Sequence, residues 1–199
     1  MDAHEWDDRY ASTELVWGAP PNPVIVSQVW PLHRGRALDL GCGEGRHAMW
    51  LALNAWTVTA VDFSRVALNK AATIATKLPR RTRDRLTWVE ADLTTWEIPG
   101  EFSLIVSAYL HFPAAQRRDL MRRCARALAP DGTIVILGHD ATNIAEGVGG
   151  PQDAEVLYTP EDIVADVEDL LTIDIAQKLQ RSTEKGVAID CLVTARRPS

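Results

Sequence analysis

One short stretch constrains the fold of this chain more than any other, because it joins an apolar strand to a turn packed with glycine. Residues 37–47 read ALDLGCGEGRH. Glycine lacks a Cβ atom, so glycines at alternate positions let a backbone bend sharply and approach a ligand closely. A helix that begins after such a turn also offers unpaired backbone N–H groups at its start. The stretch therefore predicts a strand, a loop that binds a nucleotide-type cofactor, and a helix.

The spacing of these glycines indicates which cofactor is bound. The dinucleotide fingerprint G-x-G-x-x-G would need its third glycine at position 46, where this chain has Arg46. An acidic residue inside the strand is not part of that fingerprint, but this chain has one, Asp39, two residues before Gly41. The resulting D-x-G-x-G-x-G pattern resembles motif I of the class I S-adenosylmethionine (SAM) methyltransferases. The resemblance implies that the cofactor is SAM.

Acidic residues follow the next two apolar runs. Asp62 ends the second run, 21 residues after Gly41, where an acid at the tip of a parallel strand can accept hydrogen bonds from both ribose hydroxyls. The third run, 86–89, is followed by Glu90, Ala91, Asp92 and Leu93. That tetrapeptide resembles the element that holds the adenine in the same family. Because ligands of open α/β sheets bind outside the carboxyl ends of the strands, we expect these residues to meet in one crevice with the end of a fourth run, 102–107.

Strand and helix signals alternate along the chain. Strands are expected over 36–40, 57–61, 86–89, 102–107, 133–137, 171–179 and 187–195. Helices are expected over 45–53, from a cap at Ser64 to Pro79, over 114–128 and from Thr159 onward. Such alternation predicts an α/β fold with a Rossmann-like, seven-stranded, mostly parallel sheet and helices on both faces. The short connection 182–186 makes the last two strands an antiparallel hairpin, which the methyltransferase fold adds to a Rossmann sheet.

Length and composition favour one domain. With 199 residues, 46% of them hydrophobic, we expect a single domain made of a helical lid segment, 1–34, and an α/β core, 35–199. The first thirty residues lack a signal-peptide pattern, and no run reaches the ~18 apolar residues of a membrane-spanning helix, so a cytoplasmic location is expected. The three cysteines lie far apart and form no C-x-x-C pair. They support neither a disulfide framework nor a metal site.

The charge of the chain points to a small-molecule partner. A net charge of −6 and a pI near 5.4 weigh against nucleic acid and membrane surfaces, which are bound through clustered Lys and Arg. The helix expected over 114–128 nevertheless carries a row of arginines: Arg117, Arg118, Arg122, Arg123 and Arg126. We expect this row to be a solvated helix face, because apolar residues at helical spacing supply the opposite stripe.

Several features resemble one group within the methyltransferases, the tellurite-resistance and thiopurine methyltransferases. They are the opening segment from Trp6 to Tyr10, the later Trp17, the stretch 42–47 and a basic end at 195–197. Members of this group methylate small, soft or thiol-like acceptors. The resemblance implies that the N-terminal aromatic residues close over the cofactor as a lid, and an aromatic face does stabilise a sulfonium cation. The alternative is that the same aromatic residues only attach an N-terminal helix to the core.

The predicted cofactor site combines the motif, the residues at strand ends and the N-terminal aromatic residues. It comprises Trp6, Tyr10, Trp17, Asp39, Gly41, Cys42, Gly43, Gly45, Arg46, Asp62, Phe63, Asp92, Leu93, Ser107 and Ala108. Between two glycines, Cys42 is expected to be a small packing residue and not a nucleophile.

The acceptor site is expected near the ends of the later strands. The predicted substrate contacts are His111, Phe112, His139 and Arg181, and His111 is also the candidate catalytic residue. The alternative for His111 is that it caps a loop carbonyl. Gln180 and Arg181 stand where the resemblance would place a His-Arg pair, which puts the substrate in doubt more than the cofactor. The segment 107–112 also lacks the Asn/Asp-Pro-Pro-aromatic element of enzymes that methylate base or glutamine amides, so we do not expect a nucleic-acid substrate.

Three functions follow from these observations. The favoured one is a SAM-dependent methyltransferase that acts on a small thiol, chalcogen oxyanion or phenol-like acceptor. The second is a dinucleotide-dependent oxidoreductase, against which Asp39 and Arg46 count. The third is a catalytically silent SAM-binding regulatory module.

Overall fold

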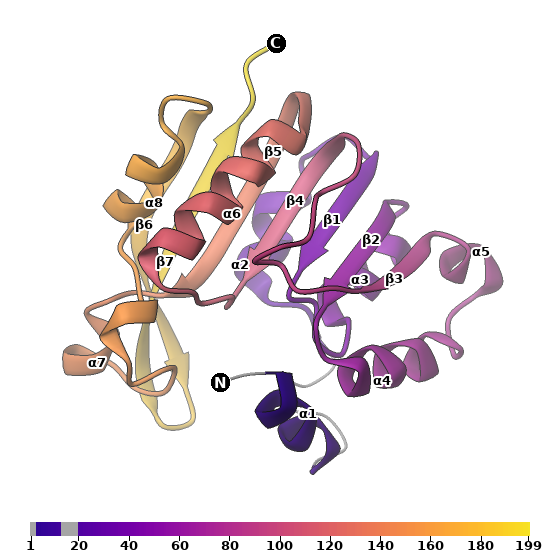
Figure 1. The fold of residues 1–199 in the computed structure, drawn as a ribbon, viewed down its shortest axis with the longest axis horizontal. Helices are drawn as coiled ribbons and strands as arrows, with labels where there is room; N and C mark the ends of the chain where they lie inside the picture. Colours follow the sequence, from indigo (N-terminus) through magenta and orange to yellow (C-terminus); the bar gives the residue numbers. More distant parts are fainter. Residues whose placement is uncertain (1–2, 13–19) are drawn as a thin grey trace. The chain divides into compact units, whose positions relative to one another are not determined.

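The computed structural model describes residues 3–12 and 20–199, which fall into two compact units that divide between Glu97 and Ile98 (Figure 1). Each unit is described by itself. Within the described ranges no helix is both long enough and apolar enough to cross a membrane.

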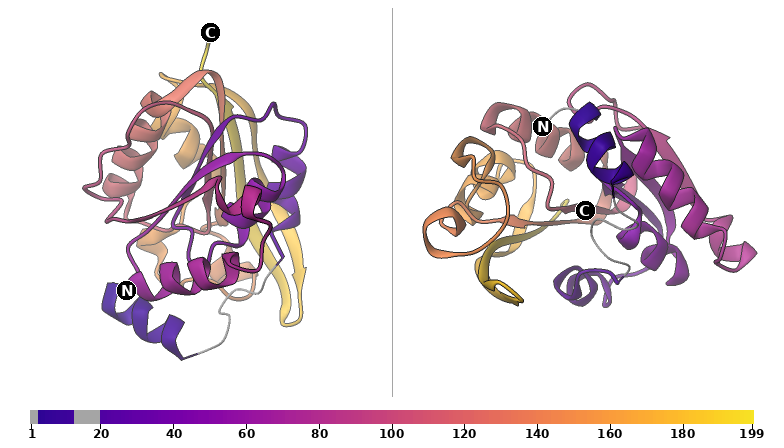
Figure 2. Two further views of the ribbon diagram at one scale, coloured as in Figure 1. Left: turned by 90° about the vertical axis from the view of Figure 1, so that its right-hand side faces the viewer. Right: turned by 90° about the horizontal axis from the view of Figure 1, so that it is seen from below.

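The first unit contains three parallel strands in the order β3-β2-β1. Its elements are α1 (Ala3–Ala11), α2 (Pro23–Val29), β1 (Arg36–Leu40), α3 (Arg46–Leu53), β2 (Thr57–Asp62), α4 (Arg65–Ala75), α5 (Arg80–Arg83) and β3 (Leu86–Glu90). Ser64 caps α4 as expected, since its Oγ accepts the backbone N–H of Ala67 at 3.1 Å. The helix α1 lies along α4 (Figure 2).

The second unit contains four strands in the order β4-β5-β7-β6. Its elements are β4 (Phe102–Ala108), α6 (Ala114–Ala127), β5 (Leu128–His139), α7 (Asn143–Glu146), the 3₁₀ helix η1 (Ala154–Val156), α8 (Pro160–Val167), β6 (Thr172–Thr183) and β7 (Gly186–Arg196). Strands β4 and β5 are parallel, whereas β7 is antiparallel to both β5 and β6. A capping box between Thr159 and Asp162 begins α8.

The strand directions confirm the predicted α/β fold class, including the antiparallel C-terminal hairpin, whose turn is Glu184 and Lys185. The bounds of β5 differ from the prediction, because the strand begins at Leu128 and not at residue 133. Its pairing with β4 shifts register between Phe102 and Leu104. The turn signal at 130–132 does not end the strand: these residues lie within β5 at this irregularity, where Asp131 has a φ of 60°.

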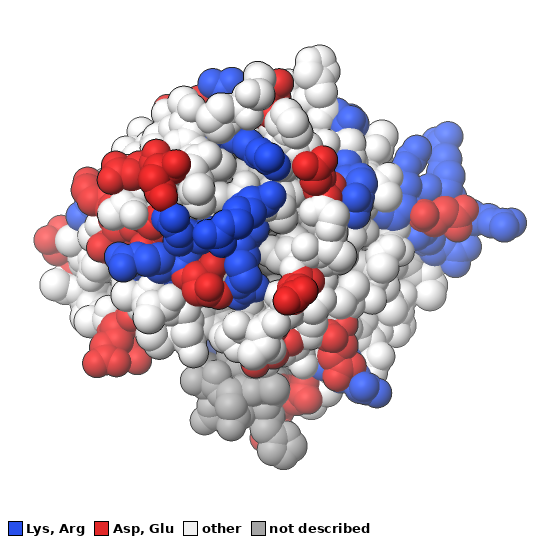
Figure 3. Space-filling model, turned by 45° about the horizontal axis from the view of Figure 1, so that its top comes forward, with Lys and Arg blue, Asp and Glu red and all other residues white. Residues whose placement is uncertain are grey.

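The expectation that the arginines of α6 form a solvated face was wrong for Arg117. This side chain is 6% exposed, and its Nε lies 2.8 Å from Oδ2 of Asp166 on α8. Arg118 also pairs with Asp166 at 3.0 Å, and Arg122 pairs at 2.7 Å with Asp169, which follows α8. Figure 3 shows acidic side chains gathered among the basic ones on this face of the molecule. The sequence pattern missed the contact because the acids lie more than forty positions away on another helix.

Candidate functional site

The loop between β1 and α3, which we call the glycine loop (Gly41–Gly45), depends on its three glycines. Their φ angles are 60°, 52° and 78°, all in the left-handed region that other residues rarely adopt. A Cβ atom on Gly45 would lie 2.5 Å from the Trp88 ring and 3.2 Å from the Ala71 side chain. The loop can therefore pack this closely only with glycine at position 45.

Asp62, at the end of β2, holds the glycine loop. Its Oδ2 accepts the backbone N–H of Gly43 at 2.8 Å, and its Oδ1 accepts that of Ser64 at 2.9 Å. Burial raises the pKa of this carboxyl, although the backbone N–H groups act in the opposite direction. An ionised carboxylate accepts about four hydrogen bonds, so Asp62 keeps capacity for the hydroxyl groups of a ligand.

Asp39 lies within β1 and is 1% exposed. Its Oδ2 has no hydrogen-bond partner among the described residues. Burial raises its pKa to about 7, against the backbone N–H of Ala48 and the charge of Arg46, which lower it. A buried polar atom without a partner costs free energy unless water or a ligand satisfies it. The atom is thus a specific reason to expect a polar group bound near the glycine loop.

The other residues predicted for the cofactor site are placed as follows. Cys42 is buried and burial raises its thiol pKa, which suits a packing residue. Leu93 is buried, while Asp92 is exposed and accepts the backbone N–H of Thr94 at 2.8 Å. Four further residues, from the first unit and β4, differ in exposure: Arg46, Phe63 and Ala108 are half-buried, and Ser107 is fully buried. Trp17 lies outside the described residues.

The N-terminal helix α1 is attached to α4. Asp7 accepts a hydrogen bond from the Ser64 hydroxyl, and the Lys70 ammonium donates one to the Tyr10 carbonyl. Lys70 Nζ also lies 3.2 Å from Oε1 of Glu44 in the glycine loop. Tyr10 is 4% exposed and its ring lies 5.5 Å from that of Trp6. These contacts attach the helix to the unit that carries the loop, and the lid role of Trp6 and Tyr10 stays a prediction.

In the second unit, His111 is engaged by the backbone. Its Nε2 accepts the N–H of His139 at 3.1 Å, and the two imidazole rings stack with their centroids 5.7 Å apart. Burial lowers the pKa of His111 to about 4, with the neighbouring His139 acting in the same direction. The ring is therefore neutral near pH 7 and its acceptor nitrogen is occupied. Such a histidine is a poor proton acceptor, so its predicted catalytic role gains no support from this geometry.

A residue that sequence reasoning missed organises this region. The 1% exposed Asp190, on β7, accepts the Tyr109 hydroxyl at 2.8 Å and Nε of Arg181 at 2.7 Å. Its Oδ1 lies 3.3 Å from Nδ1 of His139. Burial raises the pKa of Asp190, but hydrogen bonds from these partners outweigh burial and hold the pKa below its usual value. We call this group, together with His111, the Asp190 cluster.

The sequence did carry a signal for Asp190, which is an acid inside the apolar run 187–193. An unpaired charge in a buried strand is costly, so such a residue has a partner or a ligand. Of the predicted substrate contacts, the cluster brings together His111, His139 and Arg181.

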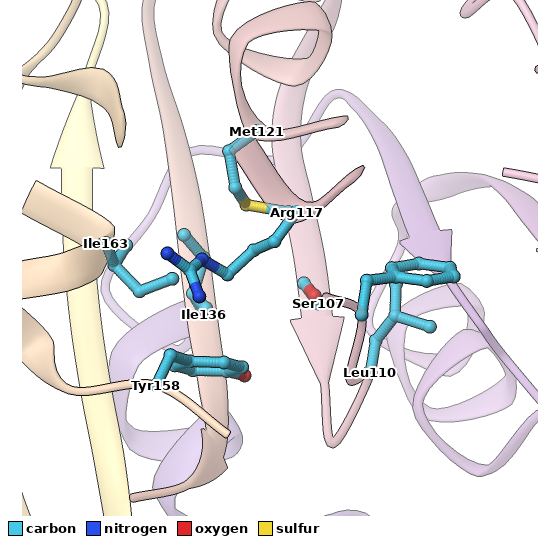
Figure 4. Close-up of a pocket in the computed structure, with 8 residues that line it drawn as sticks. Ser107, Leu110, Arg117, Met121, Ile136, Tyr158 and Ile163 are labelled. Atoms are coloured by element: carbon cyan, nitrogen blue, oxygen red, sulfur yellow. The ribbon is translucent and has the colours of Figure 1, made fainter. Parts of the chain in front are cut away.

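Phe112, the fourth predicted substrate contact, lines a small pocket in the second unit (Figure 4). The other lining residues are Ser107, Leu110, Arg117, Met121, Ile136, Tyr158 and Ile163. Arg117 reaches from α6 over the Tyr158 ring, 5.6 Å from its centroid. The buried hydroxyl of Tyr158 has no hydrogen-bond partner in the described part of the chain. The pocket is apolar apart from these two groups and Ser107.

Comparisons with known proteins bear on both units. A family model described as a methyltransferase domain matches residues 37–132. An uncharacterised methyltransferase of Mycobacterium tuberculosis is 32% identical over 127 residues, which cover 63% of this chain and 61% of that protein. The match thus spans less than two thirds of the mycobacterial protein.

The fold also has counterparts among solved structures. The N-methyltransferase NodS from Bradyrhizobium japonicum WM9, in complex with S-adenosyl-L-homocysteine, aligns over 100% of both chains with a TM-score of 0.74 and 19% identity.

Thiocyanate methyltransferase 1 of Brassica oleracea is 31% identical over 165 residues, 81% of this chain and 67% of the relative. An identity above 30% over two thirds of the relative is enough to assign the family. The chain belongs to the class I SAM-dependent methyltransferases.

Proposed function

We propose that this chain transfers a methyl group from SAM to a small-molecule acceptor, a thiol, chalcogen oxyanion or phenol-like compound. The observation that carries the proposal is the glycine loop, held by Asp62 in a conformation that residues other than glycine rarely adopt, together with the carboxylate oxygen of Asp39 that has no partner among the described residues. SAM supplies a methyl group activated by a positively charged sulfur.

The residues of the first unit fit this cofactor. The backbone of the glycine loop can lie against it without Cβ atoms in the way. Asp62 would accept hydrogen bonds from the ribose hydroxyls, since its oxygens have spare acceptor capacity. Asp92 and Leu93 would hold the adenine, as the family resemblance implies. Two ionisable carboxylates, Asp39 and Asp62, also suit a ligand that carries positive charge.

The acceptor class is supported by the second unit and by one relative. The pocket beside Phe112 is small and mostly apolar, and the Asp190 cluster adds one guanidinium, one carboxylate and two imidazoles. The cluster residues do not line that pocket; their polar groups suit a compact acceptor with one polar reacting atom. The relative from Brassica oleracea is a thiocyanate methyltransferase. It adds a small sulfur nucleophile to the acceptors worth testing.

The first test is isothermal titration of the purified protein with SAM and S-adenosylhomocysteine, with NADH and NADPH as controls. Micromolar binding of the first two alone, about −8 kcal/mol, is expected. Transfer of tritium from methyl-labelled SAM is then measured for thiols, thiopurines, phenols, thiocyanate, selenite and tellurite. Methylation of at least one of these classes is expected.

Two results would favour the alternative functions. Binding of a nicotinamide cofactor in place of SAM would support the oxidoreductase and contradict the assignment of the glycine loop. Tight binding of SAM with no transfer to any acceptor would support a silent SAM-binding module.

A further inference from the structure

His139 and Asp190 form a pair across neighbouring strands. His139 ends β5, and the antiparallel register places Asp190 of β7 directly opposite. Nδ1 of His139 lies at ion-pair distance, 3.3 Å, from Oδ1 of Asp190 but makes no hydrogen bond with the described residues. The other ring nitrogen, Nε2, makes no hydrogen bond with the described residues, and the His139 side chain is 12% exposed. One nitrogen thus faces a buried carboxylate, and the other lies at the edge of the ring beside Gly150, where a ligand would have to bind.

Packing fixes the orientation of both members. Tyr109 and Arg181 donate to the second oxygen of Asp190 at 2.8 and 2.7 Å, and the guanidinium lies 5.5 Å from the Tyr109 ring centroid. The His139 ring stacks on that of His111 with an interplanar angle of 15°. Gly150 covers the ring so closely that a Cβ there would lie 2.6 Å from Cδ2.

The charged and titratable groups that face His139 come from several elements. They are Tyr109 and His111 after β4 and Asp190 on β7, and Arg181 of β6 contacts both Tyr109 and Asp190. Oδ1 of Asp140, the next residue in the chain, lies 3.1 Å from Nζ of Lys178 and accepts the backbone N–H of Thr142. The positive charge of Arg181 balances Asp190, and His111 is neutral near pH 7, so the carboxylate can serve His139 as a hydrogen-bond acceptor.

We propose that His139 is the general base of the reaction, that Asp190 is its positioning residue, and that the acceptor therefore carries an S–H or phenolic O–H group. This inference rests on the proposed function and narrows its acceptor class, because the chalcogen atom of an oxyanion attacks through a lone pair and carries no proton to lose. A carboxylate at Nδ1 keeps the proton on that nitrogen and directs the lone pair of Nε2 toward the ligand.

The step balances as follows. Nε2 takes the proton of the acceptor, and the electron pair left on sulfur or oxygen forms the new bond to the methyl carbon. The bond between that carbon and the sulfur of SAM breaks, and its electrons stay on the sulfur. The imidazolium then releases its proton to solvent. His111 cannot do the same, because its Nε2 already accepts a backbone N–H.

The test uses a series of substituted thiophenols, some protonated and some already ionised at the assay pH. The variant His139→Gln is expected to lower kcat/KM by about 10²- to 10⁴-fold for the protonated members. For the ionised members the loss should be small, because no proton has to be removed. His33→Gln, at an exposed histidine of the first unit, is the matched control and should leave the whole series unchanged. An equal loss along the series, or no loss at all, would overturn the inference.

A second readout needs no turnover. Nitrogen-15 NMR of labelled histidine should show the neutral His139 ring with its proton on Nδ1, and Asp190→Ala should shift the proton toward Nε2. An unchanged tautomer in a folded variant would contradict the positioning role, and if Asp190→Ala does not fold, the thiophenol series decides. The two proposals fail differently. A wild-type protein that methylates no acceptor contradicts the proposed function. Wild-type turnover, with an equal loss of kcat/KM along the whole series in His139→Gln, contradicts only the roles of His139 and Asp190.

Discussion

The carboxylate of Asp62 accepts a hydrogen bond from the backbone N–H of Gly43, with 2.8 Å between Oδ2 and the nitrogen. The end of β2 therefore fixes the shape of the loop that follows β1. The same carboxylate is the proposed partner of the ribose, and that proposal makes both loop conformation and cofactor affinity depend on one side chain.

Replacing Asp62 with Asn should weaken SAM binding. The change removes the negative charge behind two backbone hydrogen bonds and the expected ribose contact, and charge-assisted hydrogen bonds contribute about 1.5 to 3 kcal/mol each. Titration calorimetry should show the dissociation constant rise at least tenfold. Asp84→Asn, at an exposed residue paired with Arg80, serves as the control. Unchanged affinity in Asp62→Asn would mean that the ribose lies elsewhere.

Gly45 and Gly149 form a natural comparison, because both have left-handed φ angles, 78° and 74°. A Cβ on Gly45 would meet the Trp88 ring at 2.5 Å, whereas one on Gly149 would meet nothing within 4 Å. Gly149→Ala should therefore cost about 1 kcal/mol, the backbone contribution alone. Gly45→Ala should cost an additional ~1 to 3 kcal/mol from overpacking. Urea denaturation measures both, and equal costs would show that Trp88 moves aside freely.

Asp39 should make stability fall as the pH rises. Its pKa is raised from 3.8 unfolded to about 7 in the fold, so between these values the folded state binds more protons than the unfolded state. The contribution of Asp39 to the free energy of unfolding is fully present below pH 4 and is lost as the pH rises through 7. His47, whose pKa burial lowers to about 3, acts in the opposite direction between pH 3 and 6.5.

The variant Asp39→Asn isolates the first effect. Relative to the wild type, its free energy of unfolding should rise between pH 4 and pH 8, by an upper bound of ~4 kcal/mol for a pKa difference of about three. Urea denaturation at several pH values measures this, and SAM is left out. Parallel curves for the two proteins would show that Asp39 does not titrate in this range.

The buried pair of Arg117 and Asp166 should matter more than an exposed one. Both side chains are nearly inaccessible, 7% and 0% exposed, so Asp166→Asn leaves a guanidinium without its counter-charge. The expected loss is about 3 to 5 kcal/mol in the free energy of unfolding. Asp119→Asn, which breaks the exposed pair with Arg123 on the same helix, should cost at most ~0.5 kcal/mol. Similar losses in the two variants would contradict the buried pair as an anchor of α6.

A lid role of the N-terminal aromatic residues can be distinguished from a role in attaching α1 to the first unit. Trp6→Ala should raise KM for SAM or lower kcat while the circular dichroism of the core stays unchanged, if the ring closes over the sulfonium. Trp30→Ala, at a residue that is 60% exposed in the same unit, is the matched control. Unaffected turnover in Trp6→Ala would leave attachment of α1 as the function of the segment.

Much of the fold could be predicted because local signals agreed with each other. The cap at Ser64, the capping box at Thr159 and the glycines of 41–45 each act within a few residues, and each lies where it was expected. The short helices α5 and α7 were missed, since a four-residue helix has no apolar periodicity to reveal it.

Less of the candidate acceptor site could be predicted, because its contacts join distant positions. Asp190 meets Tyr109 across 81 residues and Arg117 meets Asp166 across 49. No spacing rule covers such separations; only the register of the strands and the packing of the helices create them. His111 was singled out for its place after a strand, but only the structure showed that a backbone N–H occupies its acceptor nitrogen.

The reversed direction of β7 has a consequence for how this protein could change its chemistry. Side chains of a strand alternate between two faces, so sliding β7 by one residue along β5 would put Cys191 or Ile189 opposite His139 and turn the carboxylate to the other side of the sheet. The two-residue turn at Glu184 and Lys185 sets the alignment of β7 with its other neighbour, β6. An insertion that shifted β7 along β5 would take the carboxylate away from His139 while leaving every residue of the glycine loop untouched.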